Sequence, residues 1–182
     1  MLLKNRRFTY IHDITAVAIC TAMIVISSWL CIPFGVNFTL QTLAIFTISA
    51  TFSLKHSLLS IIVYLLMGIC GAPVFSGFGA GLSAVVGPTG GFLVSFVFVP
   101  VIISFLGKIS RAWLIISMVI STLICYLLGT LWYVAAYGEQ TLGDIFSVLL
   151  LCVFPFIIPD AIKIALAYFI SIRLSKIMQK IY

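Results

Sequence analysis

The placement of charge constrains this chain more than any other feature, because long stretches of it carry none. Charged residues make up 8% of the chain and hydrophobic residues 63%, whereas about 25% of the residues in a soluble domain are charged. About 20 apolar residues are needed for one helix to cross a membrane. The 182 residues therefore have room for six such helices. The sequence predicts an all-α integral membrane protein that forms one transmembrane domain over residues 1–182.

The breaks between the apolar runs predict where the six helices lie. The second and third helices are short for a full crossing, so the polar pair Lys55-His56 between them is also compatible with a re-entrant hairpin. The last helix has Pro159 as an alternative start. The expected approximate bounds are 13–32, 39–54, 57–71, 90–107, 112–137 and 148–174, with a glycine-rich outer loop at 72–89.

The basic residues predict the orientation of these helices, because cytoplasmic loops of membrane proteins collect Lys and Arg. Nine of the ten basic residues fall on one side of the expected bundle: Lys4, Arg6, Arg7, Lys55, Lys108, Arg111, Arg173, Lys176 and Lys180. We therefore expect both termini in the cytoplasm. The net charge of +6 reflects this topology and contact with membrane lipid. Because the basic residues are scattered over separate loops, we expect no nucleic-acid partner.

The tenth basic residue, Lys163, lies with Asp160 inside an apolar segment. Residues three apart on a helix share one face, so the two charges can neutralise each other. A charged side chain at bilayer depth costs about 2.5 to 3.5 kcal/mol on insertion scales, and such residues usually face a cavity or a partner. The pair indicates a binding site; a purely structural ion pair between helices is the alternative interpretation.

The stretches 71–81 and 87–91 are rich in glycine and contain no basic residue. A phosphate-binding loop would need a Lys next to its glycines, so a nucleotide site is not expected. Glycines let the backbone approach a ligand closely, and the length of the loop fits a lid over a pocket. Gly87 and Gly91, which are four residues apart, are equally typical of close helix packing.

Two further patterns offer polar groups to such a pocket. Gln41, near the outer end of the second helix, carries an amide with two donors and an acceptor. Tyr126, Gly129 and Trp132 form a stripe at three-residue spacing that is typical of packing as well as of ligand contact. With Asp160, these groups predict an apolar chamber with a few oriented polar groups, which is the usual composition of a small-molecule site.

Other chemistry finds little support in the sequence. The five cysteines are spread through apolar segments without a Cys-x-x-Cys pair, so we assign them no reaction. His12 and His56 have no further ligands at a suitable spacing, and no metal is expected. No nucleophile is paired with a base, so we expect no enzyme and no catalytic residues. A channel would need a polar path through both faces of the membrane, whereas the few polar groups here gather toward one side. A channel is therefore not expected. No cleavable signal is expected, so the first helix should remain as an anchor.

In their order and spacing, the motifs between Ala18 and Lys163 resemble the BioY family, the biotin-specific S components of energy-coupling factor (ECF) transporters. The matching pieces are Leu40-Gln41-Thr42, Gly71-Ala72-Pro73-Val74-Phe75-Ser76-Gly77, Gly87-Pro88-Thr89-Gly90-Gly91-Phe92, Tyr126-x-x-Gly129-x-x-Trp132 and Asp160-x-x-Lys163. The resemblance implies a six-helix bundle of the ECF S-component type, multi-pass in a bacterial cell membrane.

The resemblance also implies the activity and the partners. The chain is expected to capture biotin with high affinity as the substrate-binding S component of an ECF-type ABC transporter, with no cofactor of its own. The partners implied are a transmembrane coupling subunit and two ATPase subunits that use ATP. Ala18 and Ala22 match the Ala-x-x-x-Ala surface of the family, which docks onto the coupling subunit, and small residues suit such close packing. Alternatives are an S component for a different vitamin or a solitary small-molecule transporter.

Carried over residue by residue, the resemblance implies a set of biotin-binding residues: Gln41, Ser76, Gly77, Thr89, Gly90, Tyr126, Trp132, Asp160 and Lys163. We hypothesise that Asp160 accepts the ureido N–H bonds and that Lys163 supports the carbonyl or pairs with Asp160, with Gln41 adding a contact. The opposite orientation, with the tail at Lys163, stays open.

This chain departs from the family pattern at three places. It reads Ile158-Pro159-Asp160 where relatives have Pro-Gly-Asp, and Gly79 and Leu93 replace an asparagine and an arginine found in some relatives. Without that arginine, the valerate carboxylate would rely on backbone N–H groups, Ser76, Thr89 or Lys163.

Overall fold

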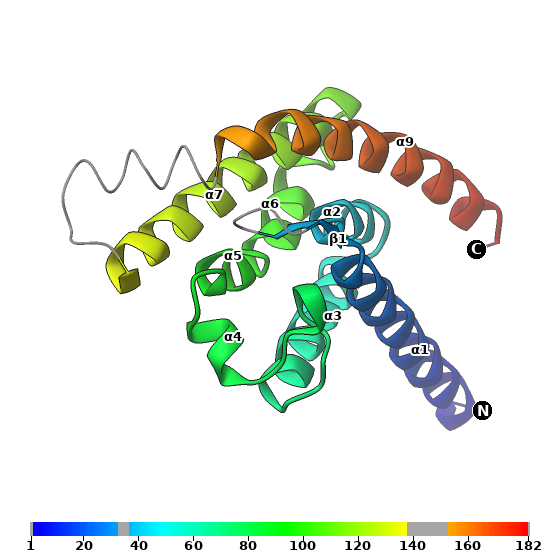
Figure 1. Cartoon of the computed structure of the whole chain (residues 1–182). Helices are drawn as coiled ribbons and strands as arrows, with labels where there is room; N and C mark the ends of the chain where they lie inside the picture. Colours follow the sequence, from blue (N-terminus) through cyan, green and yellow to red (C-terminus); the bar gives the residue numbers. More distant parts are fainter. Residues whose placement is uncertain (1, 33–36, 138–152, 182) are drawn as a thin grey trace.

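A computed structural model describes residues 2–32, 37–137 and 153–181 of the chain. It is a helical bundle with one two-stranded antiparallel ribbon, in which Cys31 lies opposite Thr39 and Ile32 opposite Phe38. In chain order the elements are α1 (Leu2–Trp29), β1 (Cys31–Ile32), β2 (Phe38–Thr39), α2 (Gln41–Thr51), α3 (Leu54–Ile69), the 3-10 turn η1 (Ser76–Phe78), α4 (Leu82–Val86), α5 (Gly90–Ser95), α6 (Phe98–Leu106), α7 (Arg111–Tyr137), the 3-10 turn η2 (Phe154–Phe156) and α9 (Ile157–Ile181) (Figure 1).

Within the described residues, three helical segments are long and apolar enough to cross a membrane: Ile11–Trp29, Arg111–Ala136 and Phe154–Ile177. The segments Leu54–Ile69 and Gly90–Leu106 are apolar but shorter. The prediction of a helical membrane protein is therefore confirmed, whereas six crossings remain a prediction. The starting end of α1 and the final end of α9 lie on the same side of the molecule (Figure 1).

The helix bounds differ from the sequence prediction where they depend on local features that a hydropathy pattern does not show. Helix α1 begins at Leu2 rather than at residue 13, because a helix can continue outside an apolar core. The expected helix 90–107 is divided into α5 and α6. Pro100 has no N–H to donate to the carbonyl of Phe96, so the helix is interrupted there. The predicted loop 72–89 contains η1 and α4, and residues 148–152 lie outside the described part of the chain.

Helix α2 lies in the middle of the bundle and contacts α9, α6 and α1. Its residues Ala44 to Ser49 are all buried. Six consecutive residues cover every side of a helix, so α2 is enclosed by the surrounding protein. At 11 residues it has a length of about 16 Å, roughly half of the hydrocarbon thickness. Its position explains why this segment is short: α2 fills the core and presents its first turn to the cavity described below.

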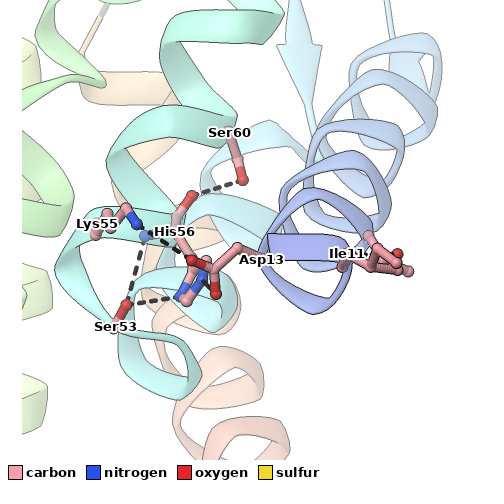
Figure 2. A network of polar contacts seen from close by, with 7 residues as sticks. Ile11, Asp13, Ser53, Lys55, His56 and Ser60 are labelled. Atoms are coloured by element: carbon pink, nitrogen blue, oxygen red, sulfur yellow. Dashed lines mark hydrogen bonds and ion pairs between the residues drawn. The ribbon is translucent and has the colours of Figure 1, made fainter. Parts of the chain in front are cut away.

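A polar cluster fixes α1 to the start of α3 (Figure 2). Asp13 accepts a hydrogen bond from Lys55 Nζ at 3.1 Å and contacts His56 Nε2 at 2.9 Å. Ser53 caps α3 by accepting the backbone N–H of His56. The Lys55 side chain is 67% exposed, so its pair with Asp13 contributes about 0 to 1 kcal/mol. The cluster explains the polar break between α2 and α3, which is a capped turn between two helices.

Glycines at the crossing of α5 and α7 allow these two helices to approach closely. A Cβ atom on Gly91 would lie 2.3 Å from Trp132 Cβ and 2.8 Å from the Leu128 carbonyl oxygen. A Cβ atom on Gly129 would lie 2.3 Å from the Phe92 ring. Gly91 and Gly129 therefore serve helix packing, and Trp132 covers Gly91.

Replacing Gly91 with alanine should destabilise the protein, because the added methyl group meets the backbone of α7 as well as a side chain. Overpacking of this kind costs about 1 to 3 kcal/mol. The midpoint of thermal unfolding in detergent measures the effect. Val94→Ala, on the exposed side of the same helix, is the matched control. Equal midpoints for the two variants would contradict the close approach of α5 to α7.

Candidate functional site

A cavity of about 210 Å³ lies among the ends of several elements. It is enclosed by β2 and α2, the loop with η1, α4 and α5, the middle of α7, and the start of α9. Most of its walls are apolar, including Phe75, Phe92, Phe96 and Phe156. Of the residues predicted from the sequence, those that line it are Gln41, Ser76, Thr89, Tyr126, Asp160 and Lys163.

The other three predicted residues are not among the described residues that line the cavity. A Cβ atom on Gly90 would lie 1.7 Å from the Val85 carbonyl oxygen, so this glycine permits the turn from α4 to α5. Trp132 packs on Gly91, and its Nε1 donates to the Gly87 carbonyl at 3.1 Å. Gly77 is exposed with a φ of 64°, a conformation that favours glycine. Each of these residues shapes the loops that enclose the cavity.

The main polar feature of the cavity is the ion pair between Asp160 and Lys163. The Lys163 Nζ atom lies 2.7 Å from Asp160 Oδ1, and their side chains are 5% and 9% exposed respectively. Tyr126 on α7 donates its hydroxyl to Asp160 Oδ2 at 2.5 Å. Buried charges are tolerated only when they are paired and hydrogen-bonded. The first two turns of α9 thus hold the neutral pair that the sequence spacing predicted, and α7 fixes its carboxylate.

Aromatic rings cover the other side of this pair. Lys163 Nζ lies 4.0 Å from the centroid of the Phe38 ring, a cation–π distance. Phe38 stacks on Phe156 with centroids 6.1 Å apart. Phe38 and Phe156 also line a separate apolar groove with Ile32, Pro155 and Pro159. The two rings therefore stand between the ion pair and this groove. Sequence analysis missed them, because phenylalanine is frequent throughout the chain.

The amide of Gln41 has fixed partners. Gln41 is 3% exposed; its Nε2 donates to the hydroxyl of Tyr64, and its Oε1 accepts from Thr39 Oγ1 at 3.2 Å. Tyr64 is fully buried on α3 and meets the Phe75 ring edge-on at a centroid distance of 5.4 Å. These contacts set the orientation of the Gln41 amide at the cavity wall. Tyr64, a lone tyrosine in an apolar run, gave no separate sequence signal.

A second amide, which sequence analysis also missed, comes from the connection between the two strands. Asn37 lines the cavity, and its Nδ2 donates to Ser76 Oγ at 3.2 Å. Gly79 and Leu93 line the cavity as well. This places an uncharged donor beside the glycine-rich loop.

The arrangement suits binding of a small, largely apolar molecule. The walls carry a neutral ion pair, amides and hydroxyls among aromatic and other apolar side chains. Among residues 2–32, 37–137 and 153–181, no group of His, Cys, Asp and Glu is placed to hold a metal ion. The helices and the cavity together define a membrane-embedded small-molecule binding protein.

Comparison with known proteins gives the family. The sequence model of the BioY family matches residues 3–180. The biotin transporter BioY of Thermotoga maritima is 36% identical over 162 residues, which cover 87% of this chain and 93% of that protein. A probable biotin transporter BioY of Pyrococcus horikoshii is 31% identical over 163 residues, covering 89% and 95%. The chain belongs to the BioY family, and the resemblance seen in its motifs is confirmed.

A solved structure has the same fold. The crystal structure of the S-component for biotin from an ECF-type ABC transporter superposes with a TM-score of 0.80 at 26% identity. The match covers 92% of this chain and 93% of that chain.

Removing the Tyr126 hydroxyl should destabilise the protein, because Asp160 loses a donor in a buried place. A hydrogen bond to a charged group contributes about 1.5 to 3 kcal/mol, so Tyr126→Phe should lower the unfolding midpoint in detergent. Tyr168→Phe is the control, since its ring contact with Phe169 is kept. Equal midpoints for Tyr126→Phe and the unaltered chain would show that the Tyr126–Asp160 bond contributes nothing.

Proposed function

We propose that this chain captures biotin from the outer side of a cell membrane and delivers it as the S component of an ECF-type transporter. The observation that carries the proposal is the buried group of Asp160, Lys163 and Tyr126 at a cavity, in a chain of the BioY family. The curated relatives are named as transporters, so the function is transport and not catalysis.

The cavity has the chemistry that biotin requires. The ureido ring of biotin presents two N–H donors and one carbonyl acceptor, and its thiophane ring and tail methylenes are apolar. Asp160 accepts the ureido N–H groups, Lys163 supports the carbonyl, and Gln41 adds a contact through its fixed amide. The aromatic walls hold the apolar parts. Because Asp160 and Lys163 are preorganised by Tyr126 and Phe38, little ordering is needed on binding.

The proposed topology has six helices that cross or enter the membrane, with both termini in the cytoplasm of a bacterial cell. The supporting observation is the distribution of the basic residues, which lie at the ends of elements away from the cavity. Lys55 lies in the first turn of α3, Lys108 lies between α6 and α7, and Arg111 is the first residue of α7. The cavity, in this arrangement, opens toward the exterior.

Energy for uptake must come from other polypeptides, because the sequence contains no nucleotide-binding motif. We assign that role to a transmembrane coupling subunit with two ATPase subunits. Ala18 and Ala22 on α1 are exposed, as are Ile11, Ile14 and Ile19. Small residues four apart allow a partner helix to approach closely where lipid supplies no hydrophobic drive. This face of α1 is the proposed coupling surface.

Asp160→Asn should weaken biotin binding at least about tenfold, because a charged hydrogen bond contributes about 1.5 to 3 kcal/mol. Equilibrium titration of the purified chain with labelled biotin measures this, and thiamine, riboflavin and folate serve as competing vitamins. Ile162→Ala, an exposed neighbour, is the control. Unchanged affinity in Asp160→Asn would contradict the assignment.

The single variant leaves Lys163 buried without its partner, so a second variant guards against misfolding. Asp160→Asn combined with Lys163→Met removes both charges and should fold, because replacing a buried ion pair by uncharged groups is often neutral for stability. Its biotin affinity should fall at least as far as that of the single variant. Retained affinity in this folded protein would refute a role for the pair in binding.

Bulky residues at the proposed coupling surface should prevent binding of the partner subunits without preventing binding of biotin. Ala18→Trp or Ala22→Trp should abolish co-purification with the coupling and ATPase subunits while biotin binding persists, because the bulky side chain prevents close helix contact. Ala165→Trp, at an exposed alanine of α9, is the matched control. Loss of both activities in the Ala18 and Ala22 variants would argue against separate surfaces.

A further inference from the structure

Among the residues that the structure describes, one cationic side chain, that of Lys163, lines the cavity. The chain contains ten Lys and Arg residues, and none falls in residues 33–36 or 138–152. Apart from Lys163, no Lys or Arg is among the described residues that line the cavity. Arg173 is ten residues further along α9, about 15 Å along the helix axis. His12 and His56 belong to a separate groove at the Asp13 end of α1. For an anionic group in the cavity, Lys163 is therefore the one cationic partner among the described residues.

Lys163 is already engaged. Its ammonium lies 2.7 Å from Asp160 Oδ1 and 4.0 Å from the centre of the Phe38 ring, and its side chain is 5% exposed. A second carboxylate beside it would place two negative charges on one buried positive charge. Burying an uncompensated charge is strongly unfavourable. A ligand carboxylate is therefore not expected at Lys163, and elsewhere in the cavity it must stay in contact with water, because no second cation lines the described walls.

Uncharged donors lie on the side of the cavity formed by the loops. Asn37 Nδ2 donates to Ser76 Oγ at 3.2 Å, and a carboxamide nitrogen has a second N–H to offer. Ser76 and Thr89 contribute hydroxyls to the same cavity. Asn37 directly precedes Phe38, whose ring lies 4.0 Å from Lys163 Nζ. Ser76 belongs to η1, and Thr89 directly precedes α5. The uncharged donors and the ion pair thus come from different elements around one cavity.

We propose that Asn37, Ser76 and Thr89 form an uncharged subsite that binds the end of the ligand's tail, so that the chain recognises the tail by hydrogen bonds and not by its charge. The inference rests on the proposed function, with the ureido ring at Asp160. Its consequence concerns substrate class: biotin derivatives whose tail ends in an amide or an alcohol are ligands of this protein alongside the acid.

Competition on the purified full chain tests the inference. Labelled biotin is displaced by biotin, by its tail carboxamide and by its tail alcohol. The uncharged subsite predicts inhibition constants within about threefold of one another. A carboxylate held by Lys163 would instead form a charged bond, and the carboxamide and alcohol would bind at least about tenfold more weakly. That second result would overturn the inference.

Variants of Leu93 supply a positive control for charge recognition. Leu93 lines the cavity one helical turn after Thr89, so it shares the same helix face. Leu93→Arg should create a preference of about tenfold or more for biotin over its carboxamide. Leu93→Gln, which introduces a polar but uncharged side chain in place of the arginine, should create no such preference. A wild-type chain that already discriminates as strongly as Leu93→Arg would contradict the uncharged subsite.

Asn37→Ala tests the subsite itself. It should weaken binding of biotin and of the carboxamide by similar factors of about fivefold, because one neutral hydrogen bond contributes about 1 kcal/mol to either tail. Unchanged binding of both ligands would remove Asn37 from the site. Failure of the proposed function is distinguishable, since in that case the unaltered protein would not retain biotin at all.

Discussion

The ion pair between Asp160 and Lys163 is the interaction on which the rest of the site depends. Two charges within an apolar helix are unfavourable unless every polar atom is matched. Here Tyr126 holds one carboxylate oxygen and Lys163 the other, while Phe38 covers the ammonium. The pair therefore joins α9, α7 and the β1–β2 ribbon around one neutral centre. A ligand that offers both donors and an acceptor can exchange with these bonds without leaving a charge unmatched.

The fold supplies this centre with rigid surroundings. Helix α2 is enclosed between α9, α6 and α1, so its first residue, Gln41, reaches the cavity from a buried position. The glycine contacts between α5 and α7 bring Phe92 against Gly129, and Phe92 also forms part of the cavity wall. At the other end of α1, the cluster of Asp13, Lys55 and His56 fixes the helix that carries the proposed coupling surface. The proposed binding site and the proposed coupling surface thus lie on separate parts of a connected bundle.

Much of the site could be predicted from the sequence because polar residues stand out in an apolar chain. Asp160, Lys163 and Gln41 are conspicuous for this reason, and all three line the cavity. Asn37, Phe38 and Phe156 could not be found, since their importance arises from contacts between distant segments. Gly90 and Trp132 belong to motifs that match the family; neither is among the described residues that line the cavity, and both make close packing contacts. Motif membership alone does not separate a residue that touches a ligand from one that shapes its surroundings.

The structure of this chain with biotin bound would test the central claim most directly. The decisive quantity is the distance between the ureido nitrogens and the carboxylate oxygens of Asp160. Our account predicts hydrogen-bond distances of about 2.7 to 3.2 Å, with the ring between Tyr126 and Gln41. A ureido ring outside the cavity, or one that contacts neither Asp160 nor Lys163, would contradict it.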